Sequence, residues 1–121
     1  PDIFADPEQM KRVINNIISN SVKYMDKPKG KIDIRLLDEV DSVRIEIEDN
    51  GKGIAAKDLP LIFERFYRTD ASRNSSQGGS GIGLSIVKKI IEDHGGYIWA
   101  TSKEGEGTCM HFVIRKYQGH E

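Results

Sequence analysis

The stretch that decides the fold is residues 43–54, which read Val-Arg-Ile-Glu-Ile-Glu-Asp-Asn-Gly-Lys-Gly-Ile. Its apolar and charged residues alternate, which is typical of a strand with one buried face. Side chains of a strand repeat every second residue, so Asp49 is expected to point toward the apolar side. A buried carboxylate needs hydrogen-bond donors, and Gly51 and Gly53 allow a sharp turn or the close approach of another molecule. The stretch therefore predicts either a locally capped β-turn or a site for a flat amino-bearing ligand such as adenine.

Size and composition exclude several classes of protein. The 121 residues are enough for one domain with a hydrophobic core, and the net charge of -1 gives no basic surplus for nucleic acid or an anionic membrane. The single cysteine, Cys109, cannot form an internal disulfide, which favours a reducing compartment. No apolar run reaches the roughly 20 residues that span a bilayer. Because the chain starts at Pro1 without a methionine, we expect it to be a piece of a longer protein.

Periodicity and turn residues predict a mixture of helices and strands. Asp6 is the expected N-cap of the first helix. The expected elements are a short strand at 1–6, a helix from 7 to about 25, strands at 32–36 and 43–49, a short helical patch at about 57–63, a helix at 81–94, and strands at 97–102 and 108–115. This order predicts an α+β fold in two layers, with an antiparallel or mixed sheet and its helices on one face.

Polar residues of the first predicted helix share one stripe. At 100° per residue, Asn16, Asn20 and Lys23 fall close together beside the apolar stripe, and Tyr24 borders them. Carboxamide oxygens can bind a hard cation, and an ammonium group can bind a phosphate. The alternative is an ordinary solvated face of the helix.

Two further stretches lie at the two ends of a polar run at 69–80. Residues 78–84, Gly-Gly-Ser-Gly-Ile-Gly-Leu, lead into a helix whose N-terminal amides could bind an anion, although neither a P-loop nor a dinucleotide fingerprint is present. The alternative is a flexible connector. Residues 63–68, Phe-Glu-Arg-Phe-Tyr-Arg, could anchor a loop to the core, with Arg65 and Arg68 near any phosphate bound by the glycines.

These motifs in this order resemble the catalytic, ATP-binding domain of sensor histidine kinases. That domain belongs to a superfamily shared with type II topoisomerase ATPases, mismatch-repair ATPases and a heat-shock chaperone. Residues 16–24 match its asparagine motif, 49–53 its first glycine motif, 63–68 its phenylalanine motif and 81–84 its second glycine motif. The resemblance covers nearly the whole chain. It implies the Bergerat ATP-binding fold, a mixed, mostly antiparallel sheet with ATP between the helices under a lid at about 55–80.

The resemblance also implies roles for individual residues. Asp49 would accept a hydrogen bond from the adenine amino group, and Asn20 would bind Mg²⁺. Asn16, Lys23 and Arg68 would act at the phosphates of ATP as the catalytic set. The other expected contacts to the nucleotide are Tyr24, Gly51, Gly53, Ile54, Phe66, Gly79, Gly81, Gly83, Leu84 and Thr108.

The reaction implied by the resemblance is transfer of the γ-phosphate to a histidine on a separate dimerisation domain. The branches of the superfamily that hydrolyse ATP place a glutamate where this chain has Asn16, and a carboxamide cannot act as a general base. His94, His111 and His120 lack the context of a phospho-accepting histidine, so we interpret them as structural or solvated. The expected partners are that dimerisation domain and the receiver domain of a response regulator. The parent would be membrane-anchored with this domain in the cytoplasm, without membrane or nucleic-acid contact of its own.

Four alternatives remain at this stage. They are a regulatory nucleotide-binding module without catalysis, a stand-alone ATPase of the same superfamily, a serine kinase of the anti-sigma-factor type, and an interaction domain without nucleotide. A module without catalysis is disfavoured because the chain retains Asn20, Asp49, Gly81 and Gly83. Asn16 argues against both the stand-alone ATPase and the serine kinase.

Overall fold

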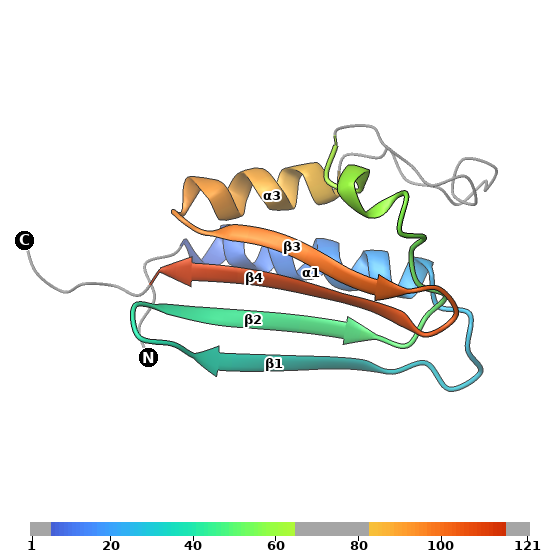
Figure 1. Ribbon diagram of the computed structural model, residues 1–121. Helices are drawn as coiled ribbons and strands as arrows, with labels where there is room; N and C mark the ends of the chain where they lie inside the picture. The colour runs from blue at the N-terminus through green and yellow to red at the C-terminus, as the bar shows by residue number, and fades with distance from the viewer. Residues whose placement is uncertain (1–5, 65–82, 116–121) are drawn as a thin grey trace, which may run out of the picture.

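The computed structural model describes residues 6–64 and 83–115. In this part of the chain, one sheet of four strands, in the order β1-β2-β4-β3, carries the two described helices on one of its faces (Figure 1). The elements are α1 (Pro7–Lys23), β1 (Ile32–Asp38), β2 (Ser42–Asp49), the 3-10 turn η1 (Leu59–Leu61), α3 (Gly83–Asp93), β3 (Tyr97–Lys103) and β4 (Gly107–Arg115). All three strand pairings in this part of the chain are antiparallel. The predicted α+β sandwich with helices on one face is therefore confirmed.

The start of α1 is held by the predicted cap and by the end of α3. The Asp6 carboxylate accepts hydrogen bonds from the Glu8 amide at 2.9 Å and the Gln9 amide at 3.4 Å. The Asp6 amide donates to Nε2 of His94 at 3.2 Å, and Nδ1 of His94 lies 2.7 Å from the Ile90 carbonyl oxygen. Both contacts are satisfied by one neutral tautomer, with the proton on Nδ1. The structural interpretation of His94 is thus confirmed.

The core lies between the two helices and the inner face of the sheet. Val43, Ile45 and Ile47 of β2 are 2%, 7% and 0% exposed, as the alternation of residues 43–48 predicts. Burying an aliphatic side chain of this size contributes about 1.5–3 kcal/mol. Their partners in the core cluster are Val13, Ile17, Ile62, Val87, Ile90, Ile91, Met110, Phe112 and Ile114.

Some predicted boundaries change. The first helix ends at Lys23 rather than about residue 25, and the helical patch expected at about 57–63 is a single 3-10 turn, Leu59–Leu61. Pro60 explains the second difference, because it has no amide N–H to donate the i→i−4 hydrogen bond that an α-helix beginning at about 57 would need. The last helix begins at Gly83 in the part of the chain that is described. The strand expected at 1–6 falls almost entirely outside the described residues, as do positions 65–82.

None of the helices in residues 6–64 and 83–115 has the length and apolar character needed to cross a membrane.

Candidate functional site

The carboxylate of Asp49 lies at the end of β2, opposite Thr108 at the start of β4. Its Oδ1 accepts hydrogen bonds from the Gly51 amide at 2.9 Å and the Thr108 amide at 3.3 Å. The predicted inward direction of Asp49 is confirmed, since it shares its face with buried Ile47. Within residues 6–64 and 83–115, both hydrogen bonds to this carboxylate go to Oδ1 and none goes to Oδ2. One oxygen therefore caps the turn, while the other is available to a donor from a ligand.

The glycines after Asp49 allow close contacts within the chain itself. A Cβ atom on Gly51 would lie 2.7 Å from the carbonyl oxygen of Tyr24. Gly53 has a φ of 77°, and a Cβ there would collide with the carbonyl oxygen of Lys103. These two glycines let the loop after β2 pack against the end of α1 and against the β3–β4 turn. They therefore help to position Asp49, independently of any contact with a ligand.

The end of α1 is joined to this loop at Tyr24. The Tyr24 carbonyl oxygen accepts a hydrogen bond from the Lys52 amide at 3.2 Å, and Nζ of Lys27 donates to the Gly51 carbonyl oxygen at 3.1 Å. The ammonium groups of Lys23 and Lys52 lie 5.3 Å and 5.1 Å from the centre of the Tyr24 ring. This corner therefore gathers positive charge suited to a phosphate. Lys52 was missed by the sequence analysis, although its place between the two glycines marked the loop that carries it.

The two asparagines of the predicted metal and phosphate site lie one turn apart on α1. Asn16 and Asn20 are half-buried, and neither carboxamide has a hydrogen-bond partner in the ranges 6–64 and 83–115. Asn16 also lies at one end of a polar hollow of about 580 Å³ along the first half of the helix, lined by Glu8, Gln9, Lys11, Arg12 and Asn15. The carboxamide oxygens of Asn16, at this hollow, and of Asn20, one turn further along the helix, are of the kind that binds a hard cation such as Mg²⁺.

A serine that the sequence analysis did not single out connects the loop to the β3–β4 turn. The Ser102 Oγ accepts a hydrogen bond from the Ile54 amide at 2.7 Å and donates to the Gly107 carbonyl oxygen at 2.8 Å. The Thr108 hydroxyl lies 2.8 Å away and acts as a second donor to the same oxygen. Thr108 is only 7% exposed. The alternation of this strand could have indicated Ser102 from the sequence, because its side chain lies on the same strand face as those of Ile98 and Ala100.

The second glycine motif is only partly described. Gly83 is the exposed first residue of α3 as described, and a Cβ there would meet no atom of residues 6–64 and 83–115 within 4 Å, so packing against these residues does not require a glycine. Leu84 packs against the core. Four predicted site residues lie outside the described part of the chain: Phe66, Arg68, Gly79 and Gly81.

Comparisons with known proteins agree with this arrangement. The family described as "Histidine kinase-, DNA gyrase B-, and HSP90-like ATPase" matches residues 5–118. The sensor histidine kinase WalK of Bacillus subtilis (strain 168) is 41% identical over 112 residues, which cover 90% of this chain and 18% of WalK. The solved structure of the mycobacterial sensor histidine kinase MprB matches with a TM-score of 0.83 at 30% identity, covering 94% of this chain and 76% of that one. Full-length ShkA, solved in complex with AMPPNP, matches with a TM-score of 0.80 at 26% identity, covering 95% of this chain and 23% of ShkA.

The share of each relative that this chain covers shows which part of that protein it corresponds to. The chain spans less than a fifth of the length of WalK, so it corresponds to one part of that kinase. It spans most of the solved MprB chain, with the same fold and 30% identity. The chain therefore belongs to the histidine kinase-, DNA gyrase B- and HSP90-like ATPase family, as a catalytic, ATP-binding domain of the sensor histidine kinase type.

Proposed function

We propose that this domain binds Mg²⁺-ATP and donates the γ-phosphate to a histidine on a separate dimerisation domain. The observation that carries the proposal is the Asp49 carboxylate, whose Oδ1 is held by the Gly51 and Thr108 amides. The adenine amino group would donate to Oδ2, beside a loop closely packed against the end of α1. The proposal is supported by ShkA, a protein that contains a domain of this fold and was solved in complex with AMPPNP.

The phosphates would lie toward the positive corner near Tyr24. Lys23 and Lys52 would neutralise phosphate charge there, together with Arg68 and the N-terminus of the last helix near Gly81 and Gly83. Asn20 would hold Mg²⁺, with Asn16 beside it. When bound, the ion supplies charge neutralisation during phosphoryl transfer. We also propose that residues from about 55 to 80 act as the lid over the nucleotide.

The phosphate acceptor would come from outside this chain. Asn16 stands at the position of a general base and cannot take a proton from water. Both ring nitrogens of His94 are in hydrogen bonds, and the two nitrogens of His111 lie 2.8 Å from Glu46 and 2.9 Å from Thr101. The domain thus positions ATP for a histidine on its dimerisation domain, and a response-regulator receiver domain would then take the phosphate.

Two other functions fit the same family. A stand-alone ATPase would need a base near the metal-binding asparagine, which Asn16 does not supply. A regulatory nucleotide-binding module would need no catalytic groups, yet Asn20 and Lys23 are present and accessible on α1.

Calorimetric titration with a non-hydrolysable ATP analogue, with and without Mg²⁺, tests the adenine site. Asp49→Asn should weaken binding about tenfold or more, because it replaces a charged acceptor whose hydrogen bond contributes about 1.5–3 kcal/mol. Asp33→Asn, on exposed β1, is the matched control and should bind as the wild type does. A folded wild type that binds no nucleotide would contradict the proposal.

Transfer itself requires the acceptor domain. The fragment, incubated with γ-labelled ATP and a supplied dimerisation domain that carries the phospho-accepting histidine, should label that domain. It should not label itself. Nucleotide binding without any transfer would favour the regulatory module instead.

A further inference from the structure

A chain of polar contacts crosses all four strands on the face of the sheet that is turned away from the helices. The Nε2 of His111 on β4 lies 2.9 Å from Oγ1 of Thr101 on β3, and its Nδ1 lies 2.8 Å from Oε2 of Glu46 on β2. The other Glu46 oxygen accepts from Nε of Arg35 on β1 at 3.1 Å. Of the two interpretations of His111, structural or solvated, the structure supports the structural one, because the side chain is only 14% exposed.

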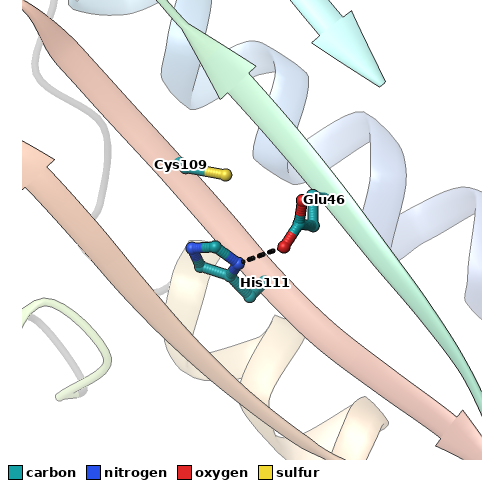
Figure 2. Close-up of side chains that lie close together, drawn as sticks. All are labelled: Glu46, Cys109 and His111. Carbon is teal, nitrogen blue, oxygen red and sulfur yellow. Dashed lines mark hydrogen bonds and ion pairs between the residues drawn. The ribbon is translucent and has the colours of Figure 1, made fainter. Parts of the chain in front are cut away.

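Three metal-ligating side chains meet within this network (Figure 2). One donor atom each from Glu46, Cys109 and His111 lies within 4.8 Å of the others. Cys109 and His111 alternate on β4, so both side chains leave the sheet on the same face, and the strand register sets His111 directly opposite Glu46. The three donors are an oxygen, a sulfur and a nitrogen, each on a strand in the middle of the sheet.

In the metal-free protein the Nδ1–H group of His111 donates to Glu46, and Nε2 accepts from the Thr101 hydroxyl. When a metal binds Nδ1, the ring proton moves to Nε2, where the Thr101 hydroxyl can accept it and hold the ring as a metal-binding imidazole is held. The Trp99 ring stacks on the imidazole with centroids 4.9 Å apart and planes 4° apart, which fixes the orientation of the imidazole. A hydrogen bond to the far nitrogen is the usual device that sets the tautomer of a metal-ligating histidine.

Arg44 makes a longer contact, with its Nε 3.9 Å from Oε2 of Glu46, but most of the positive charge at this cluster comes from Arg35. Its guanidinium lies 3.1 Å from Glu46, 3.0 Å from Glu48 and 3.7 Å from Sγ of Cys109. Its side chain is 41% exposed on the edge strand and can swing toward Glu48 alone. Burial raises the pKa of the Cys109 thiol to about 11, so without a metal the sulfur keeps its proton. A bound cation would replace both the guanidinium and that proton.

We propose that Glu46, Cys109 and His111 form a site for a divalent transition metal of the zinc class, and that Arg35 competes with the metal for it. The sulfur–metal bond forms as the thiol proton leaves to solvent, and a water molecule takes the fourth position. The mixed O, N and S donor set selects zinc-class ions over Mg²⁺, which prefers oxygen ligands alone. Strands β2 and β4 carry this site on one face and the side chains of Asp49 and Thr108 on the other. The metal site therefore does not depend on nucleotide binding.

Titration of the nucleotide-free protein with Co²⁺, followed by absorption spectroscopy, tests the proposal directly. We expect one Co²⁺ per chain, a thiolate-to-cobalt charge-transfer band, the visible bands of a tetrahedral ion, and displacement by Zn²⁺. Cys109→Ser should abolish the charge-transfer band. His111→Gln, which keeps the thiol, should weaken binding at least about tenfold, and Thr101→Val should weaken it about tenfold. His94→Gln removes a histidine outside the cluster and should leave the titration unchanged.

Arg35→Gln tests the competition, because it removes the positive charge and retains a shorter polar side chain. Binding of Co²⁺ should tighten at least about tenfold in this variant. No thiolate band in the wild type, or a band that survives Cys109→Ser, would overturn the metal site. An Arg35→Gln variant that binds Co²⁺ no more tightly than the wild type would overturn the role of Arg35. Circular dichroism of each variant confirms that the comparison is made on folded protein.

Discussion

The Oγ of Ser102 accepts a hydrogen bond from the Ile54 amide at 2.7 Å, and so ties strand β3 to the loop that follows Asp49. The two residues are 48 positions apart in the chain. The same hydroxyl donates to the Gly107 carbonyl oxygen at 2.8 Å. One small side chain thus joins the loop after β2 to the β3–β4 turn, next to the carboxylate that we propose to bind adenine.

Removal of this hydroxyl should therefore destabilise the domain. Ser102→Ala leaves the Ile54 amide and the Gly107 carbonyl oxygen without their partner, at a cost of about 1–3 kcal/mol in the free energy of unfolding. Urea denaturation followed by circular dichroism measures the change. Ser19→Ala, at an exposed position of α1, is the control and should shift stability by no more than about 0.5 kcal/mol. Equal effects of the two substitutions would show that the Ser102 contacts contribute nothing.

Gly53 and Gly105 form a matched pair that separates backbone conformation from packing. Both have positive φ, 77° and 83°, but a Cβ on Gly53 collides with the Lys103 carbonyl oxygen whereas one on Gly105 meets no atom within 4 Å. Gly105→Ala should cost about 1 kcal/mol, from the left-handed conformation alone. Gly53→Ala should cost at least about 1 kcal/mol more, because the backbone must also move. Denaturation midpoints that coincide would mean that the loop relaxes freely.

The Glu46 carboxylate should give the metal-free domain part of its stability against acid. Hydrogen bonds, first from His111 and then from Arg35, lower the pKa of Glu46 below its usual 4.5. Since the folded state binds this proton less tightly than the unfolded state, the stabilisation is complete above pH 4.5 and is lost as the pH falls through the lowered pKa. Glu46→Gln removes this contribution, so its free energy of unfolding should fall less steeply than that of the wild type between about pH 5 and 3.

Urea denaturation at a series of pH values, with a chelator present, measures this difference in slope. Glu104→Gln, in the exposed turn between β3 and β4, is the control and should follow the wild-type curve. If the Glu46→Gln curve also runs parallel to the wild-type curve, the network does not stabilise the charged carboxylate.

Asn16→Glu should turn the domain toward hydrolysis of ATP. The substitution restores a carboxylate one helical turn before Asn20, where it can accept a proton from a water molecule at the γ-phosphate. A positioned general base contributes about 10²–10⁴-fold, and we expect a gain of at least about tenfold in release of phosphate in the presence of Mg²⁺. Asn15→Glu adds the same charge to the neighbouring, exposed position and should change nothing. Equal gains in both variants would exclude a base at position 16.

Local patterns were sufficient for much of the fold. The alternation before Asp49 predicted the buried face of β2, and Asp6 with Pro7 predicted the start of α1, because both depend on contacts between residues close in the chain. The end of α1 was predicted two residues too late. There the chain leaves the helix so that the Tyr24 carbonyl oxygen can accept from Lys52, which is a tertiary contact with no local signal.

By itself, then, the sequence determined the class of fold, the inward carboxylate and the polar stripe of α1, since each follows from a period of two residues or of one helical turn. Only the tertiary structure decided which side chains meet. The order β1-β2-β4-β3 brings Glu46 against His111, 65 positions away, and Arg35 against Cys109, 74 positions away. Such pairs depend on strand order and register, which are set by packing of the whole sheet against the helices rather than by any local repeat.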